Sequence, residues 1–265
     1  ATKDYADYVK TAAHAGAHVI ISGAGLPVDL PEYVTGTDTK IAPIVSSEKA
    51  ARIILKMWDR RYKRTADFVV IEGAHAGGHL GFSREELNHL YEPDYEANYD
   101  DEIRRIIACV HEYGEKYGVH IPVITAGGIM NARQVQHAFA LGAEGVQVAT
   151  PFVTTEECDA APAYKQAYVN ASDEDVIIIK SPVGMPGRAI KNAFIERMLA
   201  APDKISHCFN CLKACNPATA PYCITQALIN AVVGDLDNGL IFCGSRVGEI
   251  TKITTVPKLM QELTV

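Results

Sequence analysis

The chain alternates short, continuously apolar segments with amphipathic helical segments, and this alternation constrains its fold more than any other feature. Continuous apolar runs are typical of parallel strands that are buried on both faces. Helical patterns separate them, most clearly at residues 101–117, where apolar residues recur on one face and Gly118 supplies a stop. The repeat predicts an α/β protein built on a parallel sheet. The predicted strands are residues 18–22, 40–45, 68–72, 121–125 and 145–149.

Local signals place the starts of two further helices. Ser83 and Glu86 have the spacing of a capping box, which predicts a helix after the glycine-rich segment that precedes them. Asn131 is the predicted N-cap of a helix over residues 132–141. The acidic, tyrosine-rich residues 91–101 are interpreted as a long surface loop, with a lid over the site as an alternative.

Small and polar residues follow two neighbouring strands in a way that suits ligand binding. Residues 126–129 read Ala-Gly-Gly-Ile, and residues 147–150 read Gln-Val-Ala-Thr. Glycines let backbone N–H groups approach a phosphate closely, and Thr150 adds a hydroxyl donor. One Gly-Gly pair could equally serve tight packing, but the paired signal favours a two-part phosphate cradle. The cradle residues are Ala126, Gly127, Gly128, Gln147, Ala149 and Thr150.

The position of this cradle assigns numbers to the predicted strands. In TIM barrels the active site lies at the carboxyl ends of the strands, and the loops after strands seven and eight often bind phosphate. The predicted strands are then strands four to eight of a TIM (β/α)8 barrel, and the first three would occupy roughly 90 residues before Ala1. An open sheet is the alternative. We expect a barrel portion over residues 1–195 and a helical, cysteine-containing C-terminal extension over residues 196–265.

Residues 72–81, Glu-Gly-Ala-His-Ala-Gly-Gly-His-Leu-Gly, form the most informative segment. A histidine among glycines can lie against a planar ligand, and near pH 7 imidazole can exchange protons or hold positive charge beside an anion. A loop histidine that only hydrogen-bonds to backbone is the alternative, but the position at the end of a strand favours His79 as the catalytic residue. A site role for His75 stays open.

Four cysteines, Cys208, Cys211, Cys215 and Cys223, lie close together in the sequence. Such density can hold zinc or an iron–sulfur cluster, so the four are candidate metal ligands. Their spacing matches no standard zinc pattern, and free buried cysteines are common, which favours a structural role. The odd total of seven cysteines favours reduced thiols.

Composition argues against several classes of protein. The formal net charge of -7 and the pI near 5.7 do not suit a non-specific nucleic-acid binder, which needs a basic face. The basic cluster at residues 56–64 is interpreted as the solvated end of a helix. No stretch approaches the roughly 20 apolar residues that span a bilayer, and the first residues lack a signal-peptide pattern. We therefore expect a cytoplasmic protein with no membrane partner.

Five motifs occur in order along the chain: Gly-Ala-Gly-Leu-Pro at 23–27, Ala-Gly-Gly-His-x-Gly at 76–81, Ala-Gly-Gly-Ile at 126–129, Val-Gln-Val-Ala-Thr-Pro-Phe at 146–152 and Arg-Ala-Ile-Lys-Asn at 188–192. Together they resemble nitronate monooxygenases, formerly called 2-nitropropane dioxygenases, and the related FMN-dependent enoyl-acyl-carrier-protein reductases. The similarity spans about residues 5–192. The combination is specific, although each motif alone is not.

The resemblance implies an FMN site with His79 as the active-site histidine. The phosphate is expected on the two-part cradle, and Gly23 and Ser46 are expected near the flavin. Two departures matter: His75 stands where many relatives have glutamate, and the family's first strands, which carry a further flavin contact, are absent. Residues 1–265 alone are therefore expected to bind flavin poorly. The expected cofactor-binding residues are Gly23, Ser46, Glu72, Gly77, Gly78, Ala126, Gly127, Gly128, Gln147, Ala149 and Thr150.

Three functions follow from these features. The leading one is an FMN-dependent oxidoreductase that oxidises alkyl nitronates with dioxygen to a carbonyl compound and nitrite. The alternative within the family is an enoyl-acyl-carrier-protein reductase that uses NAD(P)H as co-substrate. From another class, the cysteine segment could make the chain a metal- or cluster-binding protein for electron transfer or docking. A small-molecule substrate is the expected partner, and a homodimer is allowed for.

Overall fold

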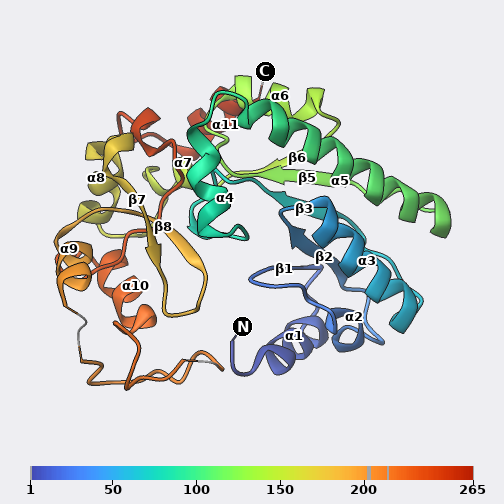
Figure 1. Cartoon of the computed structure of the whole chain (residues 1–265), viewed down its shortest axis with the longest axis horizontal. Coiled ribbons are helices and arrows are strands. Elements are labelled where there is room, and N and C mark those ends of the chain that lie inside the picture. Colours follow the sequence, from blue (N-terminus) through green and yellow to red (C-terminus); the bar gives the residue numbers. More distant parts are fainter. Residues whose placement is uncertain (1, 202–203, 214, 265) are drawn as a thin grey trace.

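A computed structural model describes residues 2–201, 204–213 and 215–264 of the chain. Its central sheet holds five strands in the order β1-β2-β3-β5-β6, and all four pairs are parallel (Figure 1). The strands are β1 (Val19–Ser22), β2 (Lys40–Val45), β3 (Val69–Glu72), β5 (Val123–Ala126) and β6 (Gly145–Gln147). The predicted α/β class with a parallel sheet is thereby confirmed.

The sheet is open in the part of the chain that the structure describes, because β1 and β6 do not pair with each other. Neighbouring strands follow one another along the chain, which is also the order that strands four to eight of a barrel would have. Val19 and Ile21 of the edge strand β1 are 44% and 43% exposed. Apolar side chains on an unpaired edge strand are typical of a surface that a further layer of protein covers.

Helices cover one face of the sheet and enclose the largest core. They are α1 (Tyr5–His14), α2 (Leu30–Tyr33), α3 (Glu48–Tyr62) and α5 (Tyr95–Tyr117). Trp58 of α3 is fully buried there, and its indole N–H donates to the Pro27 carbonyl oxygen at 3.0 Å. Ile106 of α5 and Ile71 of β3 belong to the same core. The opposite face of the sheet is therefore the one that is free to form a site.

Residues 91–101 are not the loop that their composition predicts. The helix α5 begins at Tyr95, so the prediction is wrong for residues 95–101, which form the first two turns. Tyr95 and Tyr99, one turn apart, stack with ring centroids 6.0 Å apart, and the Tyr99 hydroxyl donates to the Glu72 carbonyl oxygen at 2.8 Å. These contacts fix the start of α5 on the end of β3.

The predicted helix starts are confirmed. The short helix α4 (Arg84–Asn88) begins with a complete capping box between Ser83 and Glu86. The helix α6 (Ala132–Ala140) begins with a second one, in which Asn131 accepts from the first turn and Gln134 accepts from the Asn131 backbone. The second box lies next to the predicted phosphate cradle.

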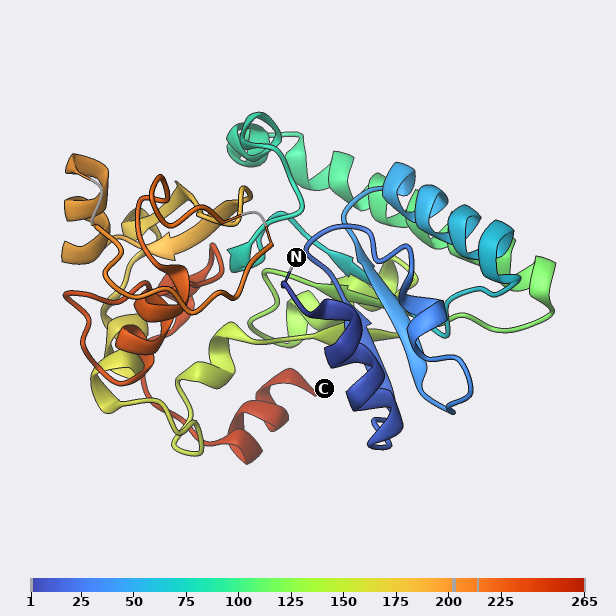
Figure 2. The ribbon, with the colours of Figure 1, turned by 90° about the horizontal axis from the view of Figure 1, so that it is seen from below.

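A second, antiparallel sheet was not predicted from the sequence. It consists of β4 (Gly78–His79), β8 (Pro186–Ile190) and β7 (Val176–Lys180), in that order. Because β4 belongs to the glycine-rich segment 72–81, this sheet anchors that segment: Gly78 pairs with Arg188 and His79 with Gly187. Around it lie α8 (Pro162–Asn170), α9 (Ala193–Ala200) and α10 (Ile224–Val232), while α11 (Val256–Leu263) packs against α6 and α7 (Thr150–Val153) (Figure 2).

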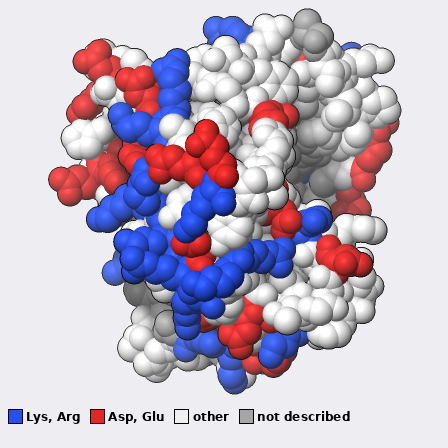
Figure 3. All heavy atoms as spheres, turned by 90° about the vertical axis from the view of Figure 1, so that its right-hand side faces the viewer, with Lys and Arg blue, Asp and Glu red and all other residues white. Residues whose placement is uncertain are grey.

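Lysine and arginine gather on the face where α3 and α5 end, interspersed with acidic residues (Figure 3). Arg52 pairs with Glu48 and Glu112, and Lys116 pairs with Asp59. The basic cluster at residues 56–64 is thus the solvated end of α3, as predicted. No helix among the described residues is long and apolar enough to cross a bilayer.

Candidate functional site

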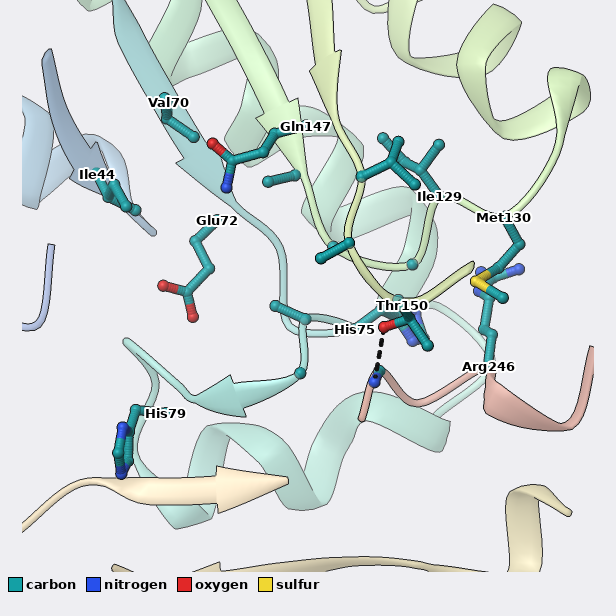
Figure 4. A pocket seen from close by; sticks show the side chains of 18 residues that line it. Ile44, Val70, Glu72, His75, His79, Ile129, Met130, Gln147, Thr150 and Arg246 are labelled. Atoms are coloured by element: carbon teal, nitrogen blue, oxygen red, sulfur yellow. Dashed lines mark hydrogen bonds between the residues drawn. The ribbon is translucent and has the colours of Figure 1, made fainter. Parts of the chain in front are cut away.

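A pocket lies at the carboxyl ends of β3, β5 and β6, on the side of the second sheet (Figure 4). Its floor includes Ile44 and Val70, which the sequence analysis missed. Such apolar strand residues carry no signal that separates a pocket floor from a core. Nine of the predicted site residues line it: Glu72, Gly77, His79, Ala126, Gly127, Gly128, Gln147, Ala149 and Thr150.

The other three predicted residues border the pocket without lining it in the described structure. Gly78 lies beside His79 in β4. Ser46 follows β2, and a Cβ atom on Gly81 would lie 2.4 Å from its hydroxyl oxygen. Gly23 follows β1, and a Cβ atom there would lie 2.9 Å from the side chain of the floor residue Ile44. All three residues therefore lie close to the pocket, next to His79, Gly81 and Ile44 respectively.

The predicted cradle has the backbone that its glycines allow. Gly127 and Gly128 have φ of +98° and +73°, which favour glycine. A Cβ atom on Gly128 would lie 2.7 Å from the His75 Cβ, and one on Gly127 would lie 2.9 Å from the Ala76 nitrogen. Packing against the glycine-rich segment thus requires glycine at both positions before any ligand is considered.

The C-terminal part of the chain supplies two pocket residues that the sequence did not reveal, Gly244 and Arg246. The Gly244 N–H donates to the Thr150 hydroxyl at 3.1 Å, which ties this segment to the cradle. Arg246 lies at the cradle as well, since a Cβ atom on Gly128 would be 3.4 Å from its Nε. A single arginine about 100 residues after Thr150 gives no local sequence signal.

Arg246 has spare capacity to bind an anion. Its guanidinium lies 3.3 Å from Glu96 and 3.8 Å from Glu249. Its Nε is buried and has no hydrogen-bond partner within the described ranges. A buried donor without a partner is costly, so a ligand oxygen at this place would satisfy it. The site chemistry therefore fits a phosphate group.

His79 is half-buried at the rim of the pocket (Figure 4). Its Nε2 lies 2.7 Å from the Ser181 hydroxyl oxygen, and its ring meets Phe242 edge-on with centroids 5.0 Å apart. Burial lowers the pKa of the imidazole below its usual 6.5. His79 is therefore neutral at pH 7 and able to accept a proton.

Glu72 projects into the same pocket from the end of β3 (Figure 4). One carboxyl oxygen accepts the Gly81 N–H at 3.1 Å. Burial raises the pKa of this carboxyl above 4.5, although the Gly81 hydrogen bond and the nearby Arg188 charge oppose the rise. A buried carboxyl group in a pocket is a common functional feature.

His75 lines the pocket too, on the side of the cradle. Its Nδ1 lies 2.6 Å from the Ser245 hydroxyl and its Nε2 lies 2.7 Å from Glu96. The hydrogen bond from His75, with smaller help from Arg246, lowers the pKa of the Glu96 carboxyl. Both ring nitrogens of His75 are thus engaged, whereas within the described residues His79 forms a hydrogen bond only through Nε2.

The buried Arg188 fixes the glycine-rich segment from below. Its side chain is 1% exposed and donates to the carbonyl oxygens of Ala74 and Ala76, at 2.6 Å in the first case. Charged donors on backbone carbonyls are among the stronger hydrogen bonds in proteins. The motif at 188–192 thus has a structural task, since its arginine positions the segment that carries His75 and His79.

The four clustered cysteines lie away from this pocket and are free thiols. Cys208 is exposed, and Cys211, Cys215 and Cys223 are partly buried. In the described ranges, no group of three or more histidine, cysteine, aspartate or glutamate side chains has an arrangement that could hold a metal ion. The structure therefore gives the metal hypothesis no support.

The fold and the pocket define an α/β protein with a glycine-lined pocket and a histidine at the carboxyl edge of a parallel sheet. The family model for nitronate monooxygenase matches residues 1–265, so the chain belongs to that family. Its members are flavin-dependent oxidoreductases. The resemblance read from the motifs is confirmed.

Relatives and solved structures agree with this assignment. A probable nitronate monooxygenase of Staphylococcus saprophyticus subsp. saprophyticus is 30% identical over 170 residues, which cover 64% of this chain and 41% of the relative. One from Staphylococcus aureus (strain Newman) is 33% identical over 163 residues, covering 62% and 38%. The chain thus spans about two fifths of the curated relatives that it matches.

Two solved structures have a similar fold. FabK from Thermotoga maritima is 29% identical with a TM-score of 0.73, and the match covers 98% of this chain and 71% of FabK. Nitroalkane oxidase from Streptomyces ansochromogenes is 20% identical with a TM-score of 0.67, covering 98% and 66%. The second likeness concerns the fold alone.

Proposed function

We propose that this chain carries the FMN site of a nitronate monooxygenase. The observation that carries the proposal is that the cradle, Arg246, Glu72 and His79 all line one pocket in a member of this family. Gly127, Gly128, Ala149 and Thr150 would hold the phosphate through backbone N–H groups and one hydroxyl. The buried, unpartnered Nε of Arg246 supports an anion at this place.

The proposed substrate is an alkyl nitronate, and the products are a carbonyl compound and nitrite. Two nitronates and one dioxygen give two carbonyl compounds and two nitrites, which balances atoms and charge. Bound FMN would supply the electron transfer. His79, neutral at pH 7, would accept the α-proton when the substrate arrives as the neutral nitroalkane, and as imidazolium it would stabilise the resulting anion.

Anaerobic reduction tests the proposal. The FMN-loaded protein is mixed in the absence of dioxygen with an alkyl nitronate in one cell and with NADH or NADPH in another. Loss of the visible flavin absorbance with the nitronate is the expected result. Loss of the flavin absorbance with NADH or NADPH alone would favour the alternative function, reduction of an enoyl thioester. The similarity to FabK supports this alternative.

His79→Ala provides the matched variant for this assay. We expect it to keep FMN, because the cradle lies on other strands, and to lower turnover of neutral nitroalkanes by roughly 10²–10⁴, the usual worth of a positioned base. Nitronates are already deprotonated, so the decrease in their turnover should be smaller. Unchanged turnover of both substrates would remove His79 from the active site.

A further inference from the structure

We infer that Ser181 is a positioning residue for His79: it occupies Nε2 of the imidazole, so that Nδ1 is the nitrogen that exchanges a proton with the substrate. Ser181 Oγ lies 2.7 Å from His79 Nε2, across 102 residues of sequence. Ser181 lies directly after β7 and was not singled out by any sequence signal. The inference rests on the proposed function for its kinetic part only.

Ser181 is itself held rigidly, which a positioning residue requires. It is 2% exposed, and the turn that joins β7 to β8 fixes it through two backbone hydrogen bonds, from its N–H to Met185 at 3.1 Å and from Gly184 to its carbonyl oxygen at 3.0 Å. The same turn brings β8 alongside His79, whose backbone pairs with Gly187. Both partners of the contact are therefore set by one hairpin.

Neighbouring side chains restrict the ring further. Phe242 meets the His79 ring edge-on. Tyr222 adjoins Ser181 on its far side: burial raises the pKa of this phenol to about 12, and the Ser181 hydroxyl partly opposes the rise. The Tyr222 hydroxyl is buried and forms no hydrogen bond of normal geometry within the described residues. Phe242 and Ser181 therefore both contact the His79 ring.

A fixed partner on one ring nitrogen determines what the other can do. A neutral imidazole carries one N–H, and a serine hydroxyl can either donate to a ring nitrogen or accept from it. For Nδ1 to accept a proton, Nε2 must carry the hydrogen and donate it to Ser181 Oγ, so the inferred form of His79 is the Nε2–H tautomer. With Nε2 held by Ser181, a flip of the ring would break that bond, and Nδ1 is the ring nitrogen that forms no hydrogen bond within the described residues. Removing the hydroxyl would release both the tautomer and the orientation.

The test compares Ser181→Ala with the parent and with Ser245→Ala. Ser245 makes the equivalent contact to the other histidine of the same segment, His75, at 2.6 Å, so its variant controls for the loss of a serine hydroxyl nearby. Imidazole ¹⁵N chemical shifts of His79, measured by NMR on each protein, report the tautomer without any substrate. We expect the Nε2–H tautomer alone in the parent and in Ser245→Ala, and a mixture in Ser181→Ala; a parent that holds the Nδ1–H tautomer would overturn the inference.

Kinetics supply the second readout. Ser181→Ala should lower kcat for a neutral nitroalkane by about tenfold to a hundredfold, less than loss of the base itself, with little change in kcat for the nitronate. Ser181→Thr keeps the hydroxyl and should restore both the tautomer and the rate. If the parent oxidises neither substrate, the proposed function fails while the NMR comparison still decides the role of Ser181. An unchanged tautomer in Ser181→Ala, or equal losses on both substrates, would overturn the inference.

Discussion

At the scale of one residue, burial of the Glu72 carboxylate in the pocket lowers the stability of the folded protein. Its carboxyl group is largely buried, and burial raises its pKa above the ordinary 4.5. Below the unfolded-state pKa the carboxyl group is protonated in both the folded and the unfolded state, so its ionisation does not lower the free energy of unfolding. Above the raised folded-state pKa the native state must hold a buried charge, so the cost is largest near neutral pH.

Glu72→Gln should therefore raise the melting temperature of the flavin-free protein at pH 7 and change it little at pH 4. Glutamine keeps an oxygen that can accept the Gly81 N–H. The exposed Glu156 offers a matched control, since Glu156→Gln should leave the melting temperature unchanged at both pH values. A lower melting temperature of Glu72→Gln at pH 7 would show that the charge stabilises the fold.

Arg246 gives a second prediction at this scale. If its guanidinium binds the phosphate, Arg246→Gln should weaken FMN binding by about 10- to 100-fold, the worth of a charged hydrogen bond. Riboflavin, which lacks the phosphate, should bind the parent and the variant equally. Flavin fluorescence titration measures both, with the exposed Lys252→Gln as the control. Equal weakening for both flavins would place Arg246 elsewhere than at the phosphate.

At the scale of elements, the capping box of α6 supports the cradle from behind. Asn131 accepts the Arg133 N–H at 3.0 Å, and Gln134 accepts the N–H groups of Met130 and Asn131 at 3.2 and 2.9 Å. Asn131→Ala should lower the free energy of unfolding by about 1 kcal/mol, and Asn131→Ser should recover most of it. Urea unfolding checks this. Equal stability of Asn131→Ala and the parent would mean that the cap contributes nothing.

The sequence predicted those elements whose cause is local. Continuous apolar runs marked the parallel strands, and side-chain caps marked α4 and α6. The start of α5 was missed because its acidic, tyrosine-rich turns are held by contacts to β3. The hairpin of β7 and β8 was missed because its pairing with the two-residue strand β4 depends on residues about 100 positions away.

The same distinction applies to the site. Glycine motifs and His79 follow strands directly and could be found from the sequence, and the structure brings nine of the predicted residues to one pocket. Arg246 and Ser181 reach the pocket region only through tertiary contacts, with Glu96 and His79 respectively. No periodicity or spacing in the sequence reports such contacts.

At the scale of the whole molecule, the pocket joins two distant parts of the chain, residues 44–150 and the segment of Gly244 and Arg246. The predicted division at residue 195 stays a prediction, and any C-terminal unit would share this pocket through Gly244 and Arg246. The open edges of the central sheet leave room for further strands beside β1 and β6. The site thus belongs to the assembled molecule and to no single βα unit.

The location of the FMN phosphate is the most direct test of the proposed FMN site. A crystal structure of the FMN-bound protein should show the phosphate within hydrogen-bond distance of the backbone N–H groups of Gly128 and Thr150 and of the Arg246 guanidinium. A phosphate bound elsewhere, for instance in the separate cavity beside Arg197 and Lys204, would contradict the account.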